Sequence, residues 1–411
     1  MTSVYSSSPQ KKFTTRDIRH SNRLNLLHQL LIEGANNRQE LSRLTALSPA
    51  TITNLTAALI QEGLVIEVGV EESQGGRPTA ILAINHEAGT CVGIDCAETY
   101  IHFELFDLAL HNLSSLEIPL STEENQPEQI ADHIAEGLDV LLAQAGVDKQ
   151  TVVGAGISIP GPFEHNTGVS VFAPNWGWHE VPIQSLLHKR ISIPLYLDNP
   201  LKFSTIAELW FGAGRGVSNF ATVVLGTGIG AGLVINGELY QGASNSAGEW
   251  GHTTLIFNGR LCRCGSRGCM EAYLGAPGII QTLRDYAPDS PILTLQNQSQ
   301  ILAQLLEAAW QGDPTATRVI NEVAQMLGAG LANIINFANP EVIVLGSWVA
   351  QQIGTYILPV MEQSIAAHAL AQPGRTAQIV LSQFTSNPVS LGAGAMMMER
   401  YFDESTAPTS R

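Results

Sequence analysis

Four potential metal ligands fall within one short segment past the middle of the chain, in the spacing His252-x9-Cys262-x-Cys264-x4-Cys269. Three thiolates and one imidazole complete a tetrahedral zinc shell and leave no position for water or substrate. The spacing therefore predicts a structural Zn²⁺ site rather than a catalytic one. Gly265 and Gly268 permit the tight turns that such crowding needs. Three unrelated cysteines in a loop are the alternative.

The remaining cysteines and the composition narrow the class of protein. Five cysteines in 411 residues cannot form a disulfide framework. Three of them cluster as potential metal ligands, which indicates a reducing cytoplasm. With 45% hydrophobic residues, the chain is long enough for two or three cores. No apolar stretch reaches ~18 residues, and no apolar run follows the basic pair near the N-terminus. Neither a membrane span nor a secretory signal is expected.

Charge is distributed unevenly along the chain. The net charge is −16, but residues 1–60 contain seven Lys and Arg against three Asp and Glu, so this segment carries +4 and the remainder −20. A surface that faces phosphate is therefore expected only in the N-terminal part, residues 1–85, which we call the head. The alternative is an uneven charge distribution without a nucleic acid partner.

The head has the pattern of a winged helix-turn-helix. Leucines recur at helical spacing up to Gly34, a second helix is expected at 38–44, and Ser48-Pro49 caps a third. Residues 64–70 and 79–84 resemble two strands joined by a Gly-rich loop. In this layout the third helix enters the major groove by its N-terminal end, and the loop can reach the minor groove. The expected DNA contacts are Arg38, Ser48, Pro49, Thr51, Thr53, Asn54, Gly76 and Arg77. A small helical domain that binds protein is the alternative.

Residues 86–395, which we call the body, alternate expected strands and helices with Gly-rich turns, the pattern of an α/β fold. A buried strand at 91–95 leads into a second strand at 101–108, and residues 223–232 form a strand followed by a Gly/Thr turn. Such turns let backbone N–H groups approach phosphate, although a hairpin in any sheet can use the same glycines. Both halves of the body open in this way, which suggests a faint duplication.

Taken together, these motifs resemble the ROK family (repressors, open reading frames and sugar kinases), and more narrowly its sugar-responsive repressors. The resemblance covers nearly all of residues 15–402. It rests on Gly75-Gly76-Arg77-Pro78, Ile159-Pro160-Gly161-Pro162, Ala173-Pro174-Asn175, LGTGIGAG at 225–232, AGEWGH at 247–252 and the segment from Cys262 to Glu271.

The resemblance implies an N-terminal winged helix-turn-helix followed by a two-lobed α/β body with the actin-like, ribonuclease-H-like sugar-kinase fold. The expected units are residues 1–85 as the DNA-binding domain, 86–200 as a first lobe completed by a C-terminal helix at 388–402, and 201–387 as a second lobe with the zinc loop and a dimerisation surface.

The resemblance also implies a sugar site in the cleft between the lobes. The residues carried over from the family are Asn175, Asn199, Glu249, His252 and Glu271. Carboxylates and amides suit a ligand with many hydroxyl groups. His252 would also bind zinc, so the metal would position the pocket. Alternatively, Glu249 and Glu271 are surface carboxylates that support the zinc loop.

Three departures from the family's kinase pattern argue against catalysis. Pro200 stands where the kinases carry the aspartate that deprotonates the sugar, and proline has no proton acceptor. Glu98 replaces a glycine of the first phosphate turn, where its charge would repel ATP. Trp348 replaces a glycine of the adenosine turn. We therefore expect no phosphorylation of sugars.

The sequence leaves three functions to compare. The first is a DNA-binding regulator, a repressor controlled by a sugar, acting as a homo-oligomer on an operator. The second is a sugar kinase with an accessory head, and the third is a zinc-stabilised regulator controlled by a protein partner. Because the kinases use the base at position 200 to hold the sugar's terminal hydroxymethyl, Pro200 favours a pentose or a linked disaccharide as ligand.

Overall fold

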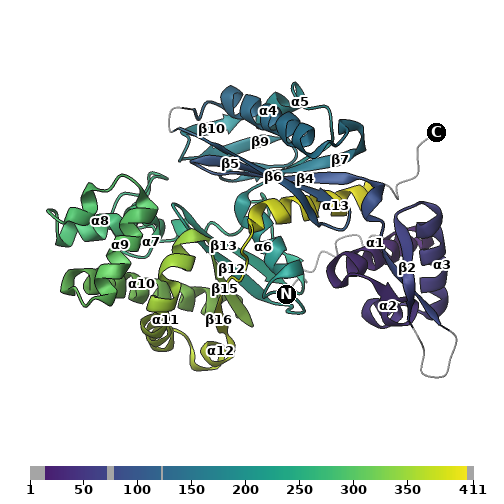
Figure 1. Ribbon diagram of the computed structural model, residues 1–411. Coiled ribbons are helices and arrows are strands. Elements are labelled where there is room, and N and C mark those ends of the chain that lie inside the picture. Colours follow the sequence, from purple (N-terminus) through teal and green to yellow (C-terminus); the bar gives the residue numbers. More distant parts are fainter. Residues whose placement is uncertain (1–13, 72–77, 122–123, 405–411) are drawn as a thin grey trace, which may run out of the picture.

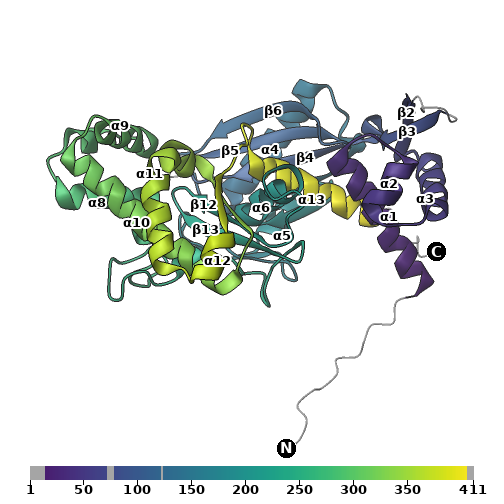
Figure 2. The ribbon, with the colours of Figure 1, turned by 90° about the horizontal axis from the view of Figure 1, so that it is seen from below.

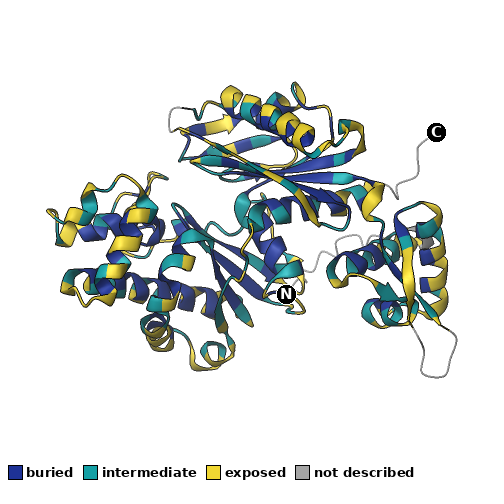
Figure 3. Cartoon of the chain, viewed as in Figure 1, coloured by how far each residue is buried: buried dark blue, intermediate teal, exposed yellow. Residues whose placement is uncertain are grey.

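The computed structural model describes residues 14–71, 78–121 and 124–404. The chain forms a small head at one end and two α/β lobes that together make the body (Figures 1 and 2). The strands of the two central sheets are largely buried between helices (Figure 3). Among the described residues, none of the helices has the length and apolar character needed to cross a bilayer.

The head contains three helices and a small antiparallel sheet. Its elements are α1 (Thr15–Glu33), β1 (Asn36–Asn37), α2 (Arg38–Thr45), α3 (Pro49–Gln61), β2 (Val65–Glu71) and β3 (Thr79–Ile84). The Ser48 hydroxyl accepts a hydrogen bond from the N–H of Thr51 at 3.2 Å, and Pro49 begins α3. The sheet has the order β1-β3-β2, so a third strand that the sequence did not suggest joins the expected pair.

The first lobe is built on a five-stranded sheet of order β11-β7-β4-β5-β6. Helices α4 and α5 lie on one face of this sheet and α13 on the other (Figure 1), and a small sheet of order β10-β9-β8 lies beside it. The elements are β4 (Thr90–Cys96), β5 (Tyr100–Asp107), β6 (Asn112–Pro119), α4 (Pro127–Ala145), β7 (Val152–Ser158), β8 (Phe163–Glu164), β9 (Val169–Ala173), β10 (Trp178–Val181), α5 (Ile183–His188), β11 (Leu195–Asp198) and α13 (Pro388–Glu404).

The second lobe repeats this topology. Its sheet has the order β14-β13-β12-β15-β16, so in each lobe the first strand lies centrally, with an antiparallel pair on one side and two parallel strands on the other. The elements are α6 (Pro200–Phe211), β12 (Phe220–Leu225), β13 (Ile229–Ile235), β14 (Glu238–Leu239), α7 (Glu271–Leu274), α8 (Ala276–Tyr286), α9 (Gln298–Trp310), α10 (Pro314–Ala338), β15 (Val342–Gly346), α11 (Ser347–His368), α12 (Ala371–Thr376) and β16 (Gln378–Leu381).

Helix α13 packs against its neighbours at backbone distance. A Cβ added to Gly156 of β7 would lie 2.0 Å from the carbonyl oxygen of Ala393 in α13. A Cβ added to Gly392 of α13 would lie 1.9 Å from the carbonyl oxygen of Phe203 in α6. Only glycine permits such approaches, so α13 is held closely between the sheet of the first lobe and α6.

The head and the body share one apolar core. Leu27 and Leu30 of α1 belong to the same buried cluster as Trp210 of α6 and Phe402 of α13. The rings of His28 and Trp210 meet edge to face with centroids 4.4 Å apart. A hydrogen bond between His20 and Asp403 at 2.6 Å and an ion pair between Arg215 and Glu33 at 2.8 Å also join the head to the body. The head is therefore packed onto the body rather than joined to it by a linker alone.

Burial of His28 makes this contact sensitive to pH. Burial lowers its pKa to about 4 from 6.5, so on acidification the unfolded chain takes up the proton first. The buried neutral ring costs the folded state nothing above pH ~6.5, and the free energy of unfolding falls as the pH drops from there toward 4. Between pH 7.5 and 5 the wild type should lose about 1–2 kcal/mol more unfolding free energy than His28→Gln. Urea denaturation at both pH values measures this difference, and equal losses would contradict the burial of the ring.

Candidate functional site

The predicted zinc ligands come together in the second lobe. His252 ends a helical turn (Trp250–His252), and the three cysteines lie in the loop before α7. One ligand atom from each of the four residues lies within 4.8 Å of the others. Backbone bridges Thr254–Cys269 and Leu261–Arg267 fold the loop back on itself. Gly265 and Gly268 adopt φ values of +89° and +81°, which favour glycine.

The distances between these side chains fit a tetrahedral metal ion. Sγ of Cys264 lies 3.7 Å from Sγ of Cys269, and Sγ of Cys262 lies 3.6 Å from Nδ1 of His252. Ligands at ~2.3 Å (S) and ~2.0 Å (N) from a tetrahedral Zn²⁺ are separated from one another by about 3.5–3.8 Å. The donor set and its spacing therefore fit zinc, held by Nδ1 of His252 and three thiolates.

The second ring nitrogen of His252 faces the expected sugar residues. Nε2 lies 3.9 Å from a carboxylate oxygen of Glu249. Glu271 lies beside the metal ligands, with one oxygen 3.7 Å from Sγ of Cys262 and the other accepting from the N–H of Ile229 at 3.3 Å. Partial burial raises the pKa of Glu249, and the neighbouring His252 opposes this rise. The zinc loop thus places His252, Glu249 and Glu271 in one group.

The structure gives Asn199 and Asn175 different surroundings. Asn199 is nearly buried and caps α6, because its side-chain oxygen accepts from the N–H of Lys202 at 2.9 Å. Its amide N–H₂ makes none of the hydrogen bonds found among the residues that the structure describes. Asn175 is half-buried in the turn between β9 and β10. None of the hydrogen bonds found within the described ranges uses its side chain. Pro200 occupies the first position of α6, where its fixed φ suits a helix start.

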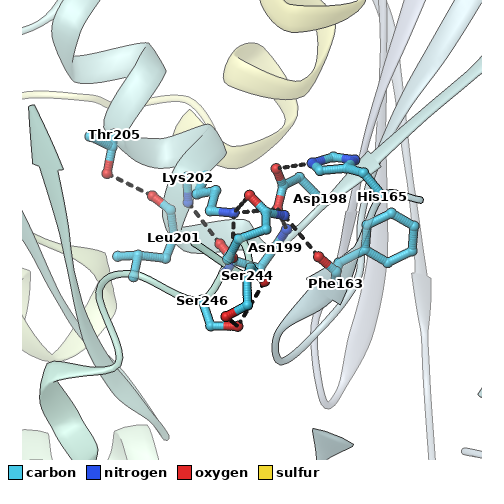
Figure 4. A network of polar contacts seen from close by, with 10 residues as sticks. Phe163, His165, Asp198, Asn199, Leu201, Lys202, Thr205, Ser244 and Ser246 are labelled. Carbon is cyan, nitrogen blue, oxygen red and sulfur yellow. Dashed lines mark hydrogen bonds and ion pairs between the residues drawn. The ribbon is translucent and has the colours of Figure 1, made fainter. Parts of the chain in front are cut away.

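A network of polar groups surrounds the start of α6 (Figure 4), in which Asp198 and Lys202 are buried and His165 is exposed. The ammonium group of Lys202 donates to Asp198 Oδ1 at 3.1 Å and to the carbonyl oxygen of Asn245 at 2.7 Å, and it also contacts Asn245 Oδ1. The second oxygen of Asp198 lies 3.0 Å from Nε2 of His165. The amide of Asn245 donates to the carbonyl oxygen of Phe163 at 2.8 Å.

Sequence reasoning missed Lys202, Asn245 and His165 as members of this site. The only local signal was the i, i+4 spacing of Asp198 and Lys202, which predicts a side-chain pair if both residues are helical. Asp198 instead ends β11, and Asn245 comes from a loop of the second lobe. The network forms only when the strand, helix and loop are assembled.

The turn that carries Glu98 meets a cation from the zinc loop. Arg263 lies 3.9 Å from Glu98 and 3.6 Å from Glu271, and it donates to the carbonyl oxygen of Thr227 at 3.0 Å. Burial raises the pKa of Glu98, and Arg263 opposes this rise. Arg263 also lines a cavity of about 390 Å³ beside the zinc loop. Arg263 therefore lies between the carboxylates of Glu98 and Glu271.

Asp95 comes shortly before the turn that carries Glu98, and Trp348 lies beside the β12–β13 turn. The carboxylate of Asp95 accepts hydrogen bonds from Ser158 at 3.0 Å, Tyr100 at 3.2 Å and Asn387 at 2.9 Å. Trp348 is the second residue of α11, and a Cβ added to Gly226 in the β12–β13 turn would lie 3.4 Å from its indole nitrogen. The segment at 223–232 is thus the end of β12, a turn and the start of β13 in a hairpin.

The expected DNA contacts that the structure describes lie around α3. Ser48, Pro49, Thr53 and Asn54 are exposed, and Thr51 is half-buried beside the cap. Arg38 donates to Thr56 at 3.1 Å and to Glu67 at 3.2 Å. Gly76 and Arg77 lie outside the described residues. Helix α3 contains no charged residue, so it offers hydroxyl and amide groups rather than cations.

Removing one thiol should abolish metal binding because the remaining three ligands cannot complete a closed shell. We expect the purified wild type to hold one zinc per chain and Cys264→Ser to hold less than a tenth of that after dialysis. Elemental analysis measures the ratio. Cys96→Ser, which changes a buried thiol outside the cluster, is the control and should keep one zinc. Equal metal content in both variants would contradict the assignment.

Comparison with known proteins places this geometry in a family. A model described as the ROK family matches residues 91–400. The xylose repressor of Caldicellulosiruptor bescii is 29% identical over 385 residues, 93% of this chain and 96% of that protein. The crystal structure of a ROK family transcriptional regulator, a homologue of the Escherichia coli Mlc protein, is similar with a TM-score of 0.77 and 26% identity, covering 94% of this chain and 97% of that one.

A kinase is also among the similar structures. The ROK family glucokinase of Streptomyces griseus, solved with glucose and AMPPNP, has a TM-score of 0.64 and 28% identity and covers 75% of this chain and 99% of that one. The family match extends over most of the body, including both five-stranded sheets and the zinc loop. The chain belongs to the ROK family.

Proposed function

We propose that this protein is a DNA-binding transcriptional regulator, a repressor, controlled by a sugar that binds in the cleft of a non-catalytic ROK body. The observation that carries the proposal is the packing of a three-helix head onto that body through one shared core. Three helices with a small sheet, a serine-proline cap and an exposed uncharged face on α3 suit a winged helix-turn-helix. The names of the repressor relatives support this reading.

The phosphate turns support a regulator over a kinase. Pro200 offers no proton acceptor, and the nearest carboxylate, Asp198, is already bonded to Lys202 and His165. Glu98 is paired with Arg263, which leaves a carboxylate where a kinase binds phosphate. The carboxylate of Asp95 already accepts three hydrogen bonds, which use most of its about four acceptor positions and leave little room for the magnesium that accompanies ATP. The kinase remains the second candidate, and ATP-dependent phosphorylation of a sugar by the purified protein would establish it.

The ligand that suits the cleft best is a pentose. His252, Glu249 and Glu271 can each bond to hydroxyl groups, and the zinc loop fixes all three. Without a carboxylate at position 200, no group there holds a terminal hydroxymethyl. The relative from Caldicellulosiruptor bescii is named a xylose repressor, and xylose is a pentose. D-xylose is therefore the first sugar to test.

The head contacts DNA best as part of a two-fold assembly. One helix in the major groove reaches few base pairs, so we propose a homodimer or a higher oligomer on an operator with two half-sites. Three arginines of the described head, Arg23, Arg38 and Arg43, pair with Glu62, Glu67 and Glu40, whereas Arg19 of α1 is exposed. We expect phosphate contacts near α3 to come mainly from backbone amides and polar side chains.

Asn54→Ala should weaken DNA binding, because an exposed amide at this place in α3 is positioned to read a base edge. We expect about a tenfold loss of affinity for DNA from upstream of the chain's own gene, which corresponds to ~1.4 kcal/mol. A gel-shift titration at fixed salt measures it. Asn321→Ala, on α10 of the body, is the matched control and should bind like the wild type. Unchanged binding by Asn54→Ala, or binding that survives deletion of residues 1–85, would count against the proposal.

Glu249→Gln should weaken sugar binding because a neutral amide is a poorer acceptor than a carboxylate for sugar hydroxyl groups. Calorimetry with D-xylose should show a loss of affinity of about tenfold. Glu362→Gln, an exposed residue of α11, is the control. Binding of D-glucose but not D-xylose would change the ligand class. Silence of the wild type toward a panel of mono- and disaccharides would favour control by a protein partner.

A further inference from the structure

We propose that helix α6 couples the ligand cleft to the head, with Lys202 as the positioning residue at one end and the Trp210–His28 contact at the other. This inference rests on the proposed function and names how the cleft and the head communicate. Helix α6 starts in the polar network of Figure 4 and ends against α1. At ~1.5 Å per residue, its 12 residues span about 18 Å.

At the cleft end, Lys202 of α6 contacts both the end of β11 and the loop that follows β14. Its ammonium group has three N–H bonds, and three acceptors from Asp198 and Asn245 surround it. Asp198 belongs to the first lobe, while Asn245 belongs to the loop between β14 and residue 250 of the second lobe. This loop also carries Glu249. The position of a proposed sugar ligand is therefore linked to the first turn of α6.

The Lys202–Asp198 pair is buried deeply enough to fix geometry. Both residues are 2% exposed. Burial lowers the pKa of Lys202, and Asp198 opposes this by stabilising the ammonium form. A buried pair of this kind adds little net stability, but losing one partner leaves an uncompensated charge. If the loop from 240 to 248 leaves, the buried ammonium group of Lys202 loses the two acceptors that Asn245 supplies, so the positions of the loop and of α6 are interdependent.

The middle of α6 lies between the two lobes. A Cβ added to Gly232 of β13 would lie 1.9 Å from Oγ1 of Thr205, and the carbonyl of Phe203 approaches Gly392 of α13 just as closely. The helix therefore contacts the sheet of the second lobe on one side and α13 on the other. No gap separates α6 from its neighbours at these two glycines. A change in how the lobes meet therefore cannot be absorbed by empty space around α6.

At the other end, α6 contacts the head directly. Trp210 is 4% exposed, and its ring packs on His28 of α1. Nε2 of His28 is buried without a hydrogen-bond partner among the described residues, so the edge-to-face contact with Trp210, rather than a polar bond, holds this ring. Arg215, four residues after α6 ends, pairs with Glu33 at the end of α1. A shift of α6 as a unit would reach α1 through these two contacts.

Hydrogen exchange of the full chain without sugar or DNA tests the coupling. Lys202→Met keeps the length of the side chain and removes its charge. We expect exchange to rise at least about threefold in the loop 240–248 and also in residues 206–211 and 24–31, with β4 unchanged. Lys149→Met, which breaks a surface pair with Asp139, is the control and should change none of these segments. A rise confined to the loop would overturn the proposal.

The reverse experiment uses the head. Because coupling is reciprocal, His28→Ala should raise exchange in the loop 240–248, although His28 does not contact it. No change there would overturn the proposal. If Lys202→Met does not fold, Asp198→Asn with Lys202→Met removes both charges and replaces it. These measurements use neither ligand, so a wild type that binds no sugar and no DNA would refute the proposed function while the exchange pattern still decides the coupling.

Discussion

Three helices from distant parts of the chain meet in one apolar core, and the proposed coupling between the sugar site and the head depends on that contact. Helix α1 belongs to the head, α6 begins in the polar network around Lys202 and α13 is the C-terminal helix of the first lobe. Glycines hold α13 at backbone distance from both the sheet and α6. A head attached only through a flexible linker could not sense the cleft. A head that shares a core with α6 is sensitive to any change in its packing.

Local features of the sequence predicted local features of the structure well. Ser48-Pro49 and Gly34 mark the start of α3 and the end of α1, because caps act through neighbouring backbone groups. The spacing of His252 and the three cysteines predicted a cluster, since the ligands lie close in sequence and turn on glycines. The family was also predicted and is confirmed by the comparisons. The DNA and sugar contacts remain predictions.

Contacts between distant segments were not predictable in the same way. Lys202 is near Asp198 in sequence, but Asn245 is 43 positions away and joins them only through the tertiary fold. Glu98 was expected to repel ATP, which stays a prediction, and no sequence pattern indicated that Arg263 of the zinc loop would lie 3.9 Å from its carboxylate. Periodicity also gave no reason to expect that the short strand β1 would pair with β3. Such features depend on which surfaces meet, and a one-dimensional pattern does not contain that information.

We propose that a sugar in the cleft and DNA on the head bias the same pair of states of the protein. The most direct measurement is reciprocal: the DNA affinity of the full chain with and without saturating D-xylose, and the D-xylose affinity with and without the DNA fragment. Linkage requires both affinities to change by the same factor, and a coupling of ~1–3 kcal/mol predicts a change of about 5- to 150-fold. Two ligands that bind tightly and leave each other's affinity unchanged would contradict the account.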